Sequence, residues 1–253
     1  MPPTSRCNIL GVHINAINMS QALATIDGWL ASRDAHYVCV TSAHGILECR
    51  KDPVLRKMFN QSGLMTPDGM SLVWLLKLRG FRNVERVCGS DLMLEIIRLS
   101  EARRWRHFFY GGTPGVADAL AHRLLSQFPG LQIAGTYCPP FRPLTESENL
   151  EIIDRIRSSQ ADIVWVGIST PKQEQWMAEH VGKVNAPVLI GVGAAFDFVS
   201  GRKKRAPRWV QHIGMEWLFR LGTEPRRLWK RYAQYPLFLA LVIAQSLGIT
   251  RYD

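Results

Sequence analysis

The stretch 161–193, ADIVWVGISTPKQEQWMAEHVGKVNAPVLIGVG, decides the fold class of this chain. It contains two nearly continuous apolar runs, at 163–168 and 188–192, separated by a helical pattern at 173–181. Strands that are apolar on both faces are typical of parallel sheets that helices cover on both sides. We therefore expect a strand, a helix and a parallel strand in this stretch.

Apolar runs and helical patterns alternate in the same way over most of the preceding sequence. The pattern predicts an α/β fold with a doubly wound, mostly parallel sheet and helices on both faces, ending near Ser200. Ligands in such folds bind beyond the carboxyl ends of the strands. The other expected strands are 9–14, 37–41, 107–110 and 131–137; the other expected helices are one capped by Ser20, 46–59, 115–128 and 147–158.

The composition is that of a globular protein. Of the 253 residues, 47% are hydrophobic and 21% are charged, which excludes a disordered, collagen-like or polytopic membrane protein. The five cysteines are widely spread and form no Cys-x-x-Cys pair, so we expect reduced thiols in a cytosolic protein, without disulfides or a zinc site. The first ten residues lack an apolar segment behind a basic one, so we expect no signal peptide.

Positive charge is concentrated near the C-terminus. Within 202–231, ten basic residues face only Glu216 and Glu224, so this segment carries +8 of the chain's net charge of +10. We therefore expect an α/β body over 1–200 and a basic appendage over 201–253. Nucleic acid, an anionic membrane surface and a phosphorylated substrate are three partners that such a charge could attract.

The pattern of the appendage favours a membrane surface. Apolar positions from Trp209 to Leu221 form one stripe of an amphipathic helix, and Pro225 suits the start of another basic helix. About a dozen apolar residues follow Pro236, fewer than the roughly 20 that span a bilayer. Basic amphipathic helices beside a short apolar helix fit a membrane interface. An exposed basic face over a packed terminal helix, a dimer contact and nucleic-acid binding remain alternatives.

Several expected strand ends carry residues suited to a ligand. Gly111 and Gly112 lead into a helix whose N-terminus could take a phosphate, although a tight turn without ligand explains them equally well. Lys172 and Gln173 lie at another helix start, which suits anionic or polyol groups; alternatively, Pro171 simply starts a helix on which Lys172 and Glu174 are exposed. Asp197 either holds ribose hydroxyls or pairs with the arginines that follow it. No dinucleotide-binding glycine pattern and no Walker A sequence occurs.

Two further residues could take part in chemistry. Asp68 lies in a Pro-Asp-Gly turn, which turn geometry alone explains but which would also hold a general base rigidly. His44 follows the strand expected at 37–41 and is more typical of a structural histidine than of a catalyst. The histidines show no metal-ligand spacing and there is no Asp-x-Asp pair, so we expect no metal and no other cofactor.

Four segments together resemble the WecG/TagA/CpsF glycosyltransferases, in the same order and over nearly the whole chain. They are TPDGMSLVW (66–74), ERVCGSDLM (85–93), GISTPKQEQWMAEH (167–180) and the long run 191–232 from GVGAAFDF to WKRY. The resemblance implies a Rossmann-like body and a basic C-terminal appendage that reaches the membrane. It also implies inverting, metal-independent transfer of a sugar from a UDP-sugar to a polyprenyl-diphosphate-linked sugar. Such enzymes work at the inner face of the cell membrane in exopolysaccharide, capsule or wall polymer synthesis.

Carried over by position, the resemblance makes Asp68 the general base and Arg86 the group that stabilises the departing UDP. Many members have Asn where this chain has Ala43 followed by His44, so either His44 replaces that polar contact or the donor sugar differs. Further positions that match are Thr41, Gln173 and Asp197 at the nucleotide-sugar pocket and Arg220, Arg227 and Arg231 facing the lipid diphosphate.

Two other functional classes are alternatives to a glycosyltransferase. A dinucleotide-dependent oxidoreductase would use a similar sheet, but the glycine fingerprint and a ribose-binding acid after the second strand are absent. A nucleic-acid-binding protein would use 202–231 and show strongly salt-sensitive binding. The sequence favours the transferase and no nucleic acid, and it leaves the donor sugar, the acceptor sugar and homo-oligomer formation open.

Overall fold

The structure is a computed structural model that describes residues 5–252. The N-terminal segment on which the signal-peptide expectation rests lies partly outside these residues. The described chain begins with an antiparallel hairpin of β1 (Arg6–Ile9) and β2 (Val12–Asn15). Leu10 and Gly11 form its turn, both with positive φ (54° and 86°). The single strand predicted at 9–14 was therefore wrong, because the chain reverses between these two residues.

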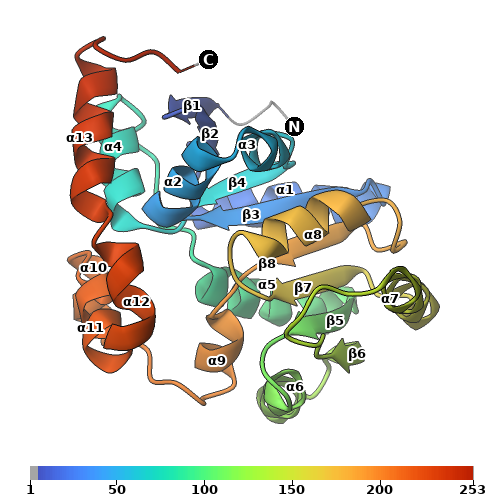
Figure 1. Cartoon of the computed structure of the whole chain (residues 1–253). Coiled ribbons are helices and arrows are strands. Elements are labelled where there is room, and N and C mark those ends of the chain that lie inside the picture. The colour runs from blue at the N-terminus through green and yellow to red at the C-terminus, as the bar shows by residue number, and fades with distance from the viewer. Residues whose placement is uncertain (1–4, 253) are drawn as a thin grey trace.

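Six parallel strands form the central sheet, in the order β4-β3-β8-β7-β5-β6 (Figure 1). Every pair of neighbours in this sheet is parallel, which confirms the predicted fold class. The strands are β3 (His36–Thr41), β4 (Leu64–Pro67), β5 (Arg106–Gly111), β6 (Gln132–Tyr137), β7 (Ile163–Gly167) and β8 (Val188–Gly191).

Helices cover both faces of the sheet because its central strands are apolar on both faces. In β7, Ile163 and Trp165 belong to one hydrophobic cluster, and Val164 and Val166 belong to the other. One face is covered by α1 (Met19–Ser32), α5 (Gly89–Arg103), α6 (Val116–Gln127) and α9 (Ala195–Val199). The other is covered by α2 (Ala43–Lys51), α3 (Pro53–Asn60), α7 (Glu146–Ser159) and α8 (Lys172–His180), with α4 (Met70–Leu78) packed beside them.

Local sequence explains where two helices differ from the prediction. The helix expected over 46–59 is divided into α2 and α3, because Pro53 starts a new helix. The Asp52 side chain caps this new helix by accepting from the backbone N–H groups of Val54 and Leu55. The first helix is capped by Asn18 rather than by Ser20.

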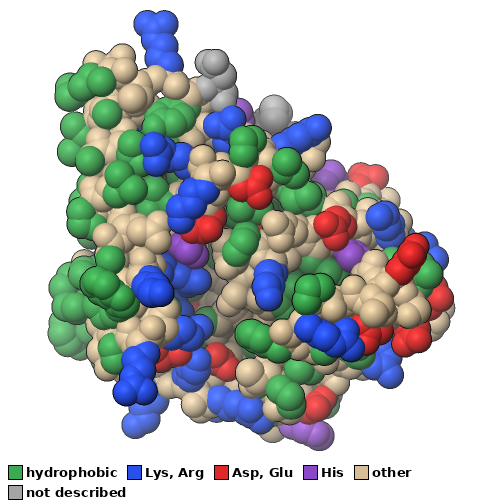
Figure 2. All heavy atoms as spheres, viewed as in Figure 1, with side chains coloured by type: hydrophobic (Ala, Val, Ile, Leu, Met, Phe, Trp, Pro, Cys, Tyr) green, Lys and Arg blue, Asp and Glu red, His purple; other side chains and the backbone are tan. Residues whose placement is uncertain are grey.

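Four helices follow the sheet: α10 (Arg208–His212), α11 (Glu216–Thr223), α12 (Pro225–Tyr232) and α13 (Tyr235–Ser246). The one helix predicted from Trp209 is two, since Gly214 has φ +74° and packs so closely on Trp74 that a Cβ there would lie 2.7 Å from its ring. Phe238 and Val242 of α13 are buried in the cluster that also holds α2 side chains. Hydrophobic side chains remain exposed along α13 and beside α10 and α11 (Figure 2).

Within residues 5–252, no helix is long and apolar enough to span a bilayer.

A buried histidine joins the sheet to α5. His107 on β5 is fully buried; its Nδ1 accepts from the indole N–H of Trp165 at 3.0 Å, and its Nε2 lies 2.8 Å from Ser100 Oγ. Because Trp165 donates to Nδ1, the ring proton of the neutral form sits on Nε2. Burial lowers the pKa of His107 to about 3, so the imidazole is neutral in the folded protein at neutral pH.

Replacing His107 with Leu leaves a buried indole N–H without an acceptor, and we expect a loss of about 1–3 kcal/mol in unfolding free energy at pH 7. The unfolded chain takes up a proton near pH 6.5, whereas folded His107 takes one up only near 3. The stability due to His107 is therefore lost as the pH falls below 6.5. The wild-type advantage should narrow by up to about 2 kcal/mol between pH 7 and 5 in urea unfolding. The same change at exposed His122 should have no such effect, and an advantage that widens at pH 5 would contradict the assignment.

Candidate functional site

A cavity of about 750 Å³ opens beyond the carboxyl ends of β3, β4, β7 and β8. From β3 the chain continues to β4, at one edge of the sheet, whereas β8 and β7 lie on the other side of β3. The loops that follow these strands therefore diverge and leave a crevice between them. Side chains from α4 and from α10–α13 enclose the crevice from outside. The body and the C-terminal helices therefore share one site.

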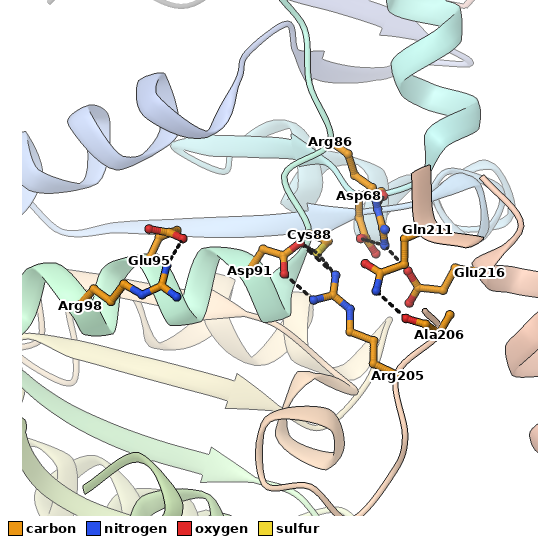
Figure 3. Close-up of polar contacts among 10 residues, drawn as sticks. All are labelled: Asp68, Arg86, Cys88, Asp91, Glu95, Arg98, Arg205, Ala206, Gln211 and Glu216. Carbon is orange, nitrogen blue, oxygen red and sulfur yellow. Dashed lines mark hydrogen bonds and ion pairs between the residues drawn. The ribbon is translucent and has the colours of Figure 1, made fainter. Parts of the chain in front are cut away.

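An aspartate and two partners lie at the centre of this cavity (Figure 3). Asp68 directly follows β4, and its backbone N–H donates to the Thr41 carbonyl at 2.8 Å, which holds the turn against β3. Arg86 donates from Nε to the Asp68 carbonyl at 2.5 Å, and its Nη2 lies 3.3 Å from Asp68 Oδ1. The same Nη2 lies 2.8 Å from Glu216 Oε2, which comes from the first turn of α11.

The neighbours of Asp68 set its acidity. Burial raises the pKa of Asp68 and Arg86 opposes this, while Glu216 raises it and Arg220 lowers it. Burial alone would lower the pKa of Arg86, but the facing Asp68, Cys88 and Glu216 raise it instead. Asp68 is thus a carboxylate of increased basicity beside a permanently charged arginine, a combination suited to accepting a proton while an anion forms nearby.

Two other predicted residues, His44 and Gln173, lie in the same cavity. His44 Nδ1 is buried without a hydrogen-bond partner, 3.9 Å from Glu48 Oε1. Burial, followed by the charge of Arg231, lowers the pKa of His44 to about 4, so its ring is neutral at pH 7. Gln173 is 2% exposed, and its Oε1 is buried without a partner. Both side chains can form further hydrogen bonds with a ligand.

Arginines from the C-terminal segment add positive charge to the cavity. Arg227 is paired with Glu224 (Nε to Oε2, 2.6 Å). By contrast, neither Arg220 nor Arg231 has a carboxylate within 4.0 Å among residues 5–252. Burial lowers the pKa of Arg231, and the like charges of Arg220 and Arg227 lower it further. Such a cluster favours an anionic ligand, and phosphate oxygens suit arginine best.

A second group of polar contacts, besides those of Arg86, holds the start of the C-terminal segment against the α/β body. Both guanidinium Nη atoms of Arg205 pair with the carboxylate of Asp91, in the first turn of α5, and Nη2 also donates to Cys88 Sγ at 3.1 Å (Figure 3). Gln211 on α10 donates to the carbonyl of Ala206 at 2.7 Å, which fixes the next turn. Arg205 and Glu216 both line the cavity and were not among the predicted site residues.

The family model described as the glycosyl transferase WecG/TagA/CpsF family matches residues 7–252. The chain belongs to this family. Two relatives are both named N-acetylglucosaminyldiphosphoundecaprenol N-acetyl-beta-D-mannosaminyltransferase. The one from Bacillus spizizenii is 30% identical over 78% of this chain and 74% of its own length. The one from Staphylococcus aureus is 24% identical over 93% of this chain and 91% of its own length.

Membership of the WecG/TagA/CpsF family confirms the resemblance seen in the sequence and makes this chain a glycosyltransferase. Among the functional classes considered above, the family and the names of the relatives support the glycosyltransferase. Within residues 5–252, no group of three or more His, Cys, Asp or Glu side chains is arranged to hold a metal ion, and the five cysteines are free.

The structure places seven of the predicted site residues in the cavity lining and leaves five outside it, within residues 5–252. The seven that line it are Asp68, Arg86, His44, Gln173, Arg220, Arg227 and Arg231. The five outside it are Thr41, Gly111, Gly112, Glu174 and Asp197.

Structural contacts account for the places of three of these five residues. Thr41 is buried, and its carbonyl accepts the Asp68 N–H. Gly111 allows β5 to approach β7 closely, since a Cβ there would lie 2.6 Å from the Gly167 carbonyl carbon. Asp197 pairs with Lys203 at 2.9 Å, a lysine rather than one of the arginines expected in the alternative interpretation. Direct ligand contacts of these residues stay predictions.

The unneutralised arginines lead to a test that does not depend on the reaction. Arg231→Gln removes like-charge repulsion, so we expect the ligand-free variant to melt at the same temperature as the wild type or higher. Inorganic pyrophosphate in the presence of EDTA should raise the melting temperature of the wild type, and its affinity for the variant should be about tenfold lower or worse. Exposed Arg251→Gln is the control. Equal pyrophosphate affinities in all three proteins would show that the cluster binds no anion.

Proposed function

We propose that this glycosyltransferase moves a sugar from a UDP-sugar to a sugar carried on a polyprenyl diphosphate, with inversion and without a metal ion. The observation that carries the proposal is that Asp68 and Arg86 share one cavity with the unpaired Arg220 and Arg231. A proton acceptor and a site for diphosphates thus lie side by side. The two relatives are named for an N-acetylglucosaminyl-diphosphoundecaprenol acceptor, and we propose the same class of acceptor here.

The reaction would be a direct displacement. The acceptor hydroxyl oxygen forms a bond with the anomeric carbon of the donor sugar, and its proton passes to the Asp68 carboxylate. The bond between the anomeric carbon and the UDP oxygen breaks on the opposite side, and its electron pair leaves with UDP. Because the acceptor oxygen attacks from the side opposite UDP, the configuration of the anomeric carbon is inverted. Arg86 stabilises the negative charge that develops on the leaving diphosphate.

In this mechanism arginines do what a divalent cation does in other nucleotide-sugar enzymes. A guanidinium group is always charged and can bind two phosphate oxygens at once. Arg86, Arg220 and Arg231 all reach the cavity, so they can neutralise the donor and acceptor diphosphates together. This arrangement supports metal-independent transfer.

The donor sugar is proposed as a hexose or N-acetylhexosamine. The relatives are named for N-acetylmannosaminyl transfer, but this chain has Ala43 and His44 where many members of the family have Asn. The neutral His44 ring can supply a polar contact in that place, as either donor or acceptor.

The surface around the cavity supports contact with an anionic membrane. Side chains on α4 and α13 both line the cavity and are exposed outside it, so an apolar surface continues from the cavity to the exterior. Leu78 is 86% exposed and Ile243 58% exposed. We propose that 201–253, with its apolar and basic side chains, holds the enzyme peripherally at the inner face of the cell membrane. The other exposed apolar side chains here are Trp74, Trp209, Ile213, Met215, Leu218, Trp229, Leu237, Leu239, Leu247 and Ile249.

The transferase proposal is tested by measuring UDP release from a panel of UDP-sugars with lipid-linked acceptor analogues. We expect release with at least one pair, unchanged by EDTA. Asp68→Asn should keep UDP-induced thermal stabilisation but lower turnover by about 10²–10⁴-fold, because only the proton acceptor is removed. Full turnover by this variant would exclude Asp68 as the base, and complete inhibition by EDTA would exclude the metal-free mechanism.

The membrane proposal is tested in the full chain by replacing two exposed apolar residues that do not line the cavity. Trp209→Glu combined with Leu247→Glu should weaken binding to phosphatidylglycerol vesicles at least about tenfold, since each change removes an apolar anchor and adds a repelled charge. Stabilisation by UDP should not change. Leu150→Glu on α7, with a similar exposure of 55%, is the control. Equal vesicle binding by all three proteins would refute the proposed surface.

A further inference from the structure

Two polar residues at the start of α8 are buried where exposed side chains are the rule. Glu174 is 0% exposed and Gln173 is 2% exposed. Gln173 lines the cavity, whereas Glu174 does not and lies behind it. Burial raises the pKa of Glu174 to about 7, against the effect of its hydrogen bonds with Gln173 and Thr170. Burying an ionisable group at this position is unfavourable and requires an explanation.

The hydrogen bonds of Glu174 determine which way the Gln173 amide points. Gln173 Nε2 donates to Glu174 Oε1 at 2.9 Å, and Thr170 Oγ1 donates to the same oxygen at 2.9 Å. An ionised carboxylate only accepts hydrogen bonds, so with Glu174 ionised, turning the amide over would place two oxygens against each other. Glu174 therefore fixes the NH₂ group of Gln173 towards itself and leaves the carbonyl oxygen on the other side.

That carbonyl oxygen has no hydrogen-bond partner among residues 5–252. Gln173 Oε1 is buried and unpaired among the described residues. The neighbouring strand end provides room for the amide because it carries glycines: a Cβ at Gly191 would lie 3.2 Å from Nε2, and one at Gly193 would lie 3.5 Å from Oε1. A buried acceptor without a donor is unfavourable, and a ligand N–H or O–H group would remove that penalty.

We propose that Glu174 is a positioning residue that makes Gln173 a hydrogen-bond acceptor in the cavity, where Gln173 Oε1 receives an N–H or O–H group of the UDP-sugar. This inference rests on the proposed function. A ligand without that donor group leaves the buried oxygen unpaired and is rejected, so the pair of residues contributes to substrate selection.

The test is a double-mutant cycle of Glu174→Met, Gln173→Met and the double variant, with Glu174→Gln added. We expect Glu174→Met to raise the KM for the UDP-sugar about tenfold or more, with kcat changed less than about threefold. If Glu174 acts through Gln173, the double variant should be no worse than Gln173→Met alone. Glu174→Gln should recover most of the lost affinity, because its amide oxygen can accept the same two hydrogen bonds.

Binding measurements distinguish the two sources of the donor group. Weaker binding of UDP itself by Glu174→Met and by Gln173→Met places the group on the nucleotide, whereas weaker binding of the UDP-sugar alone places it on the sugar. Both results support the proposal. An unchanged KM in Glu174→Met, or KM effects that multiply in the double variant, would overturn it.

Stability measurements complete the design. A purely structural Glu174 would lower the melting temperature without the KM change and without coupling to Gln173. Should Glu174→Met not fold, Glu174→Leu takes its place in the cycle, and Glu174→Gln must still bind the UDP-sugar more tightly than Gln173→Met does. Absence of UDP release by the wild type would count against the proposed function, whereas the present inference fails only when an active wild type is matched by Glu174→Met.

Discussion

The guanidinium of Arg86, held between Asp68 and Glu216, is the interaction on which the site depends. Asp68 belongs to the turn after β4, and Glu216 belongs to α11 in the C-terminal segment. One arginine therefore joins the sheet to the helices that follow it, and the cavity exists only where the two meet. Because Glu216 also raises the pKa of Asp68, the same contact that closes the site tunes the carboxylate inside it.

In the ligand-free protein, some arginines of the cavity are paired with carboxylates and others are not. Arg205 pairs with Asp91 on α5 and fastens the C-terminal segment to the body, whereas Arg227 pairs with Glu224 inside that segment. Arg220 and Arg231 have none among the described residues and carry mutual repulsion into a partly buried place. Unneutralised charge of this kind lowers stability and is retained at functional sites because a ligand of opposite charge relieves it. Arg205 therefore holds the site together, whereas Arg220 and Arg231 are available to an anionic ligand.

The sequence predicted the fold where the pattern is continuous and failed where tertiary contacts decide. Strands β3, β5, β7 and β8 follow directly from apolar runs, but β4 is only four residues long and was not foreseen as a strand. Asp68 and Arg86 could be found because they lie in family motifs. The phosphate contact predicted at Gly111 illustrates the difficulty. In the sequence, a glycine that lets two backbones approach closely cannot be distinguished from one that makes room for a phosphate. Glu216 gave a weak signal, as one of only two acidic residues within the basic segment 202–231, and its contact with Arg86 required the structure.

The apolar character of α13 has two separate causes. One side of the helix is buried: Phe238 and Val242 belong to the hydrophobic core beside α2. The other side, with Leu239 and Ile243, is exposed and also borders the cavity. An amphipathic pattern cannot arise in a helix that is apolar on both sides, which is why the sequence left its role open. A ligand with a charged diphosphate and a long hydrocarbon chain meets both properties at once: the arginines lie inside the cavity, and the apolar surface leads out of it. These two properties fit a lipid-linked diphosphate acceptor. Its hydrocarbon chain can cover the exposed apolar rim, which a water-soluble diphosphate would leave in contact with water.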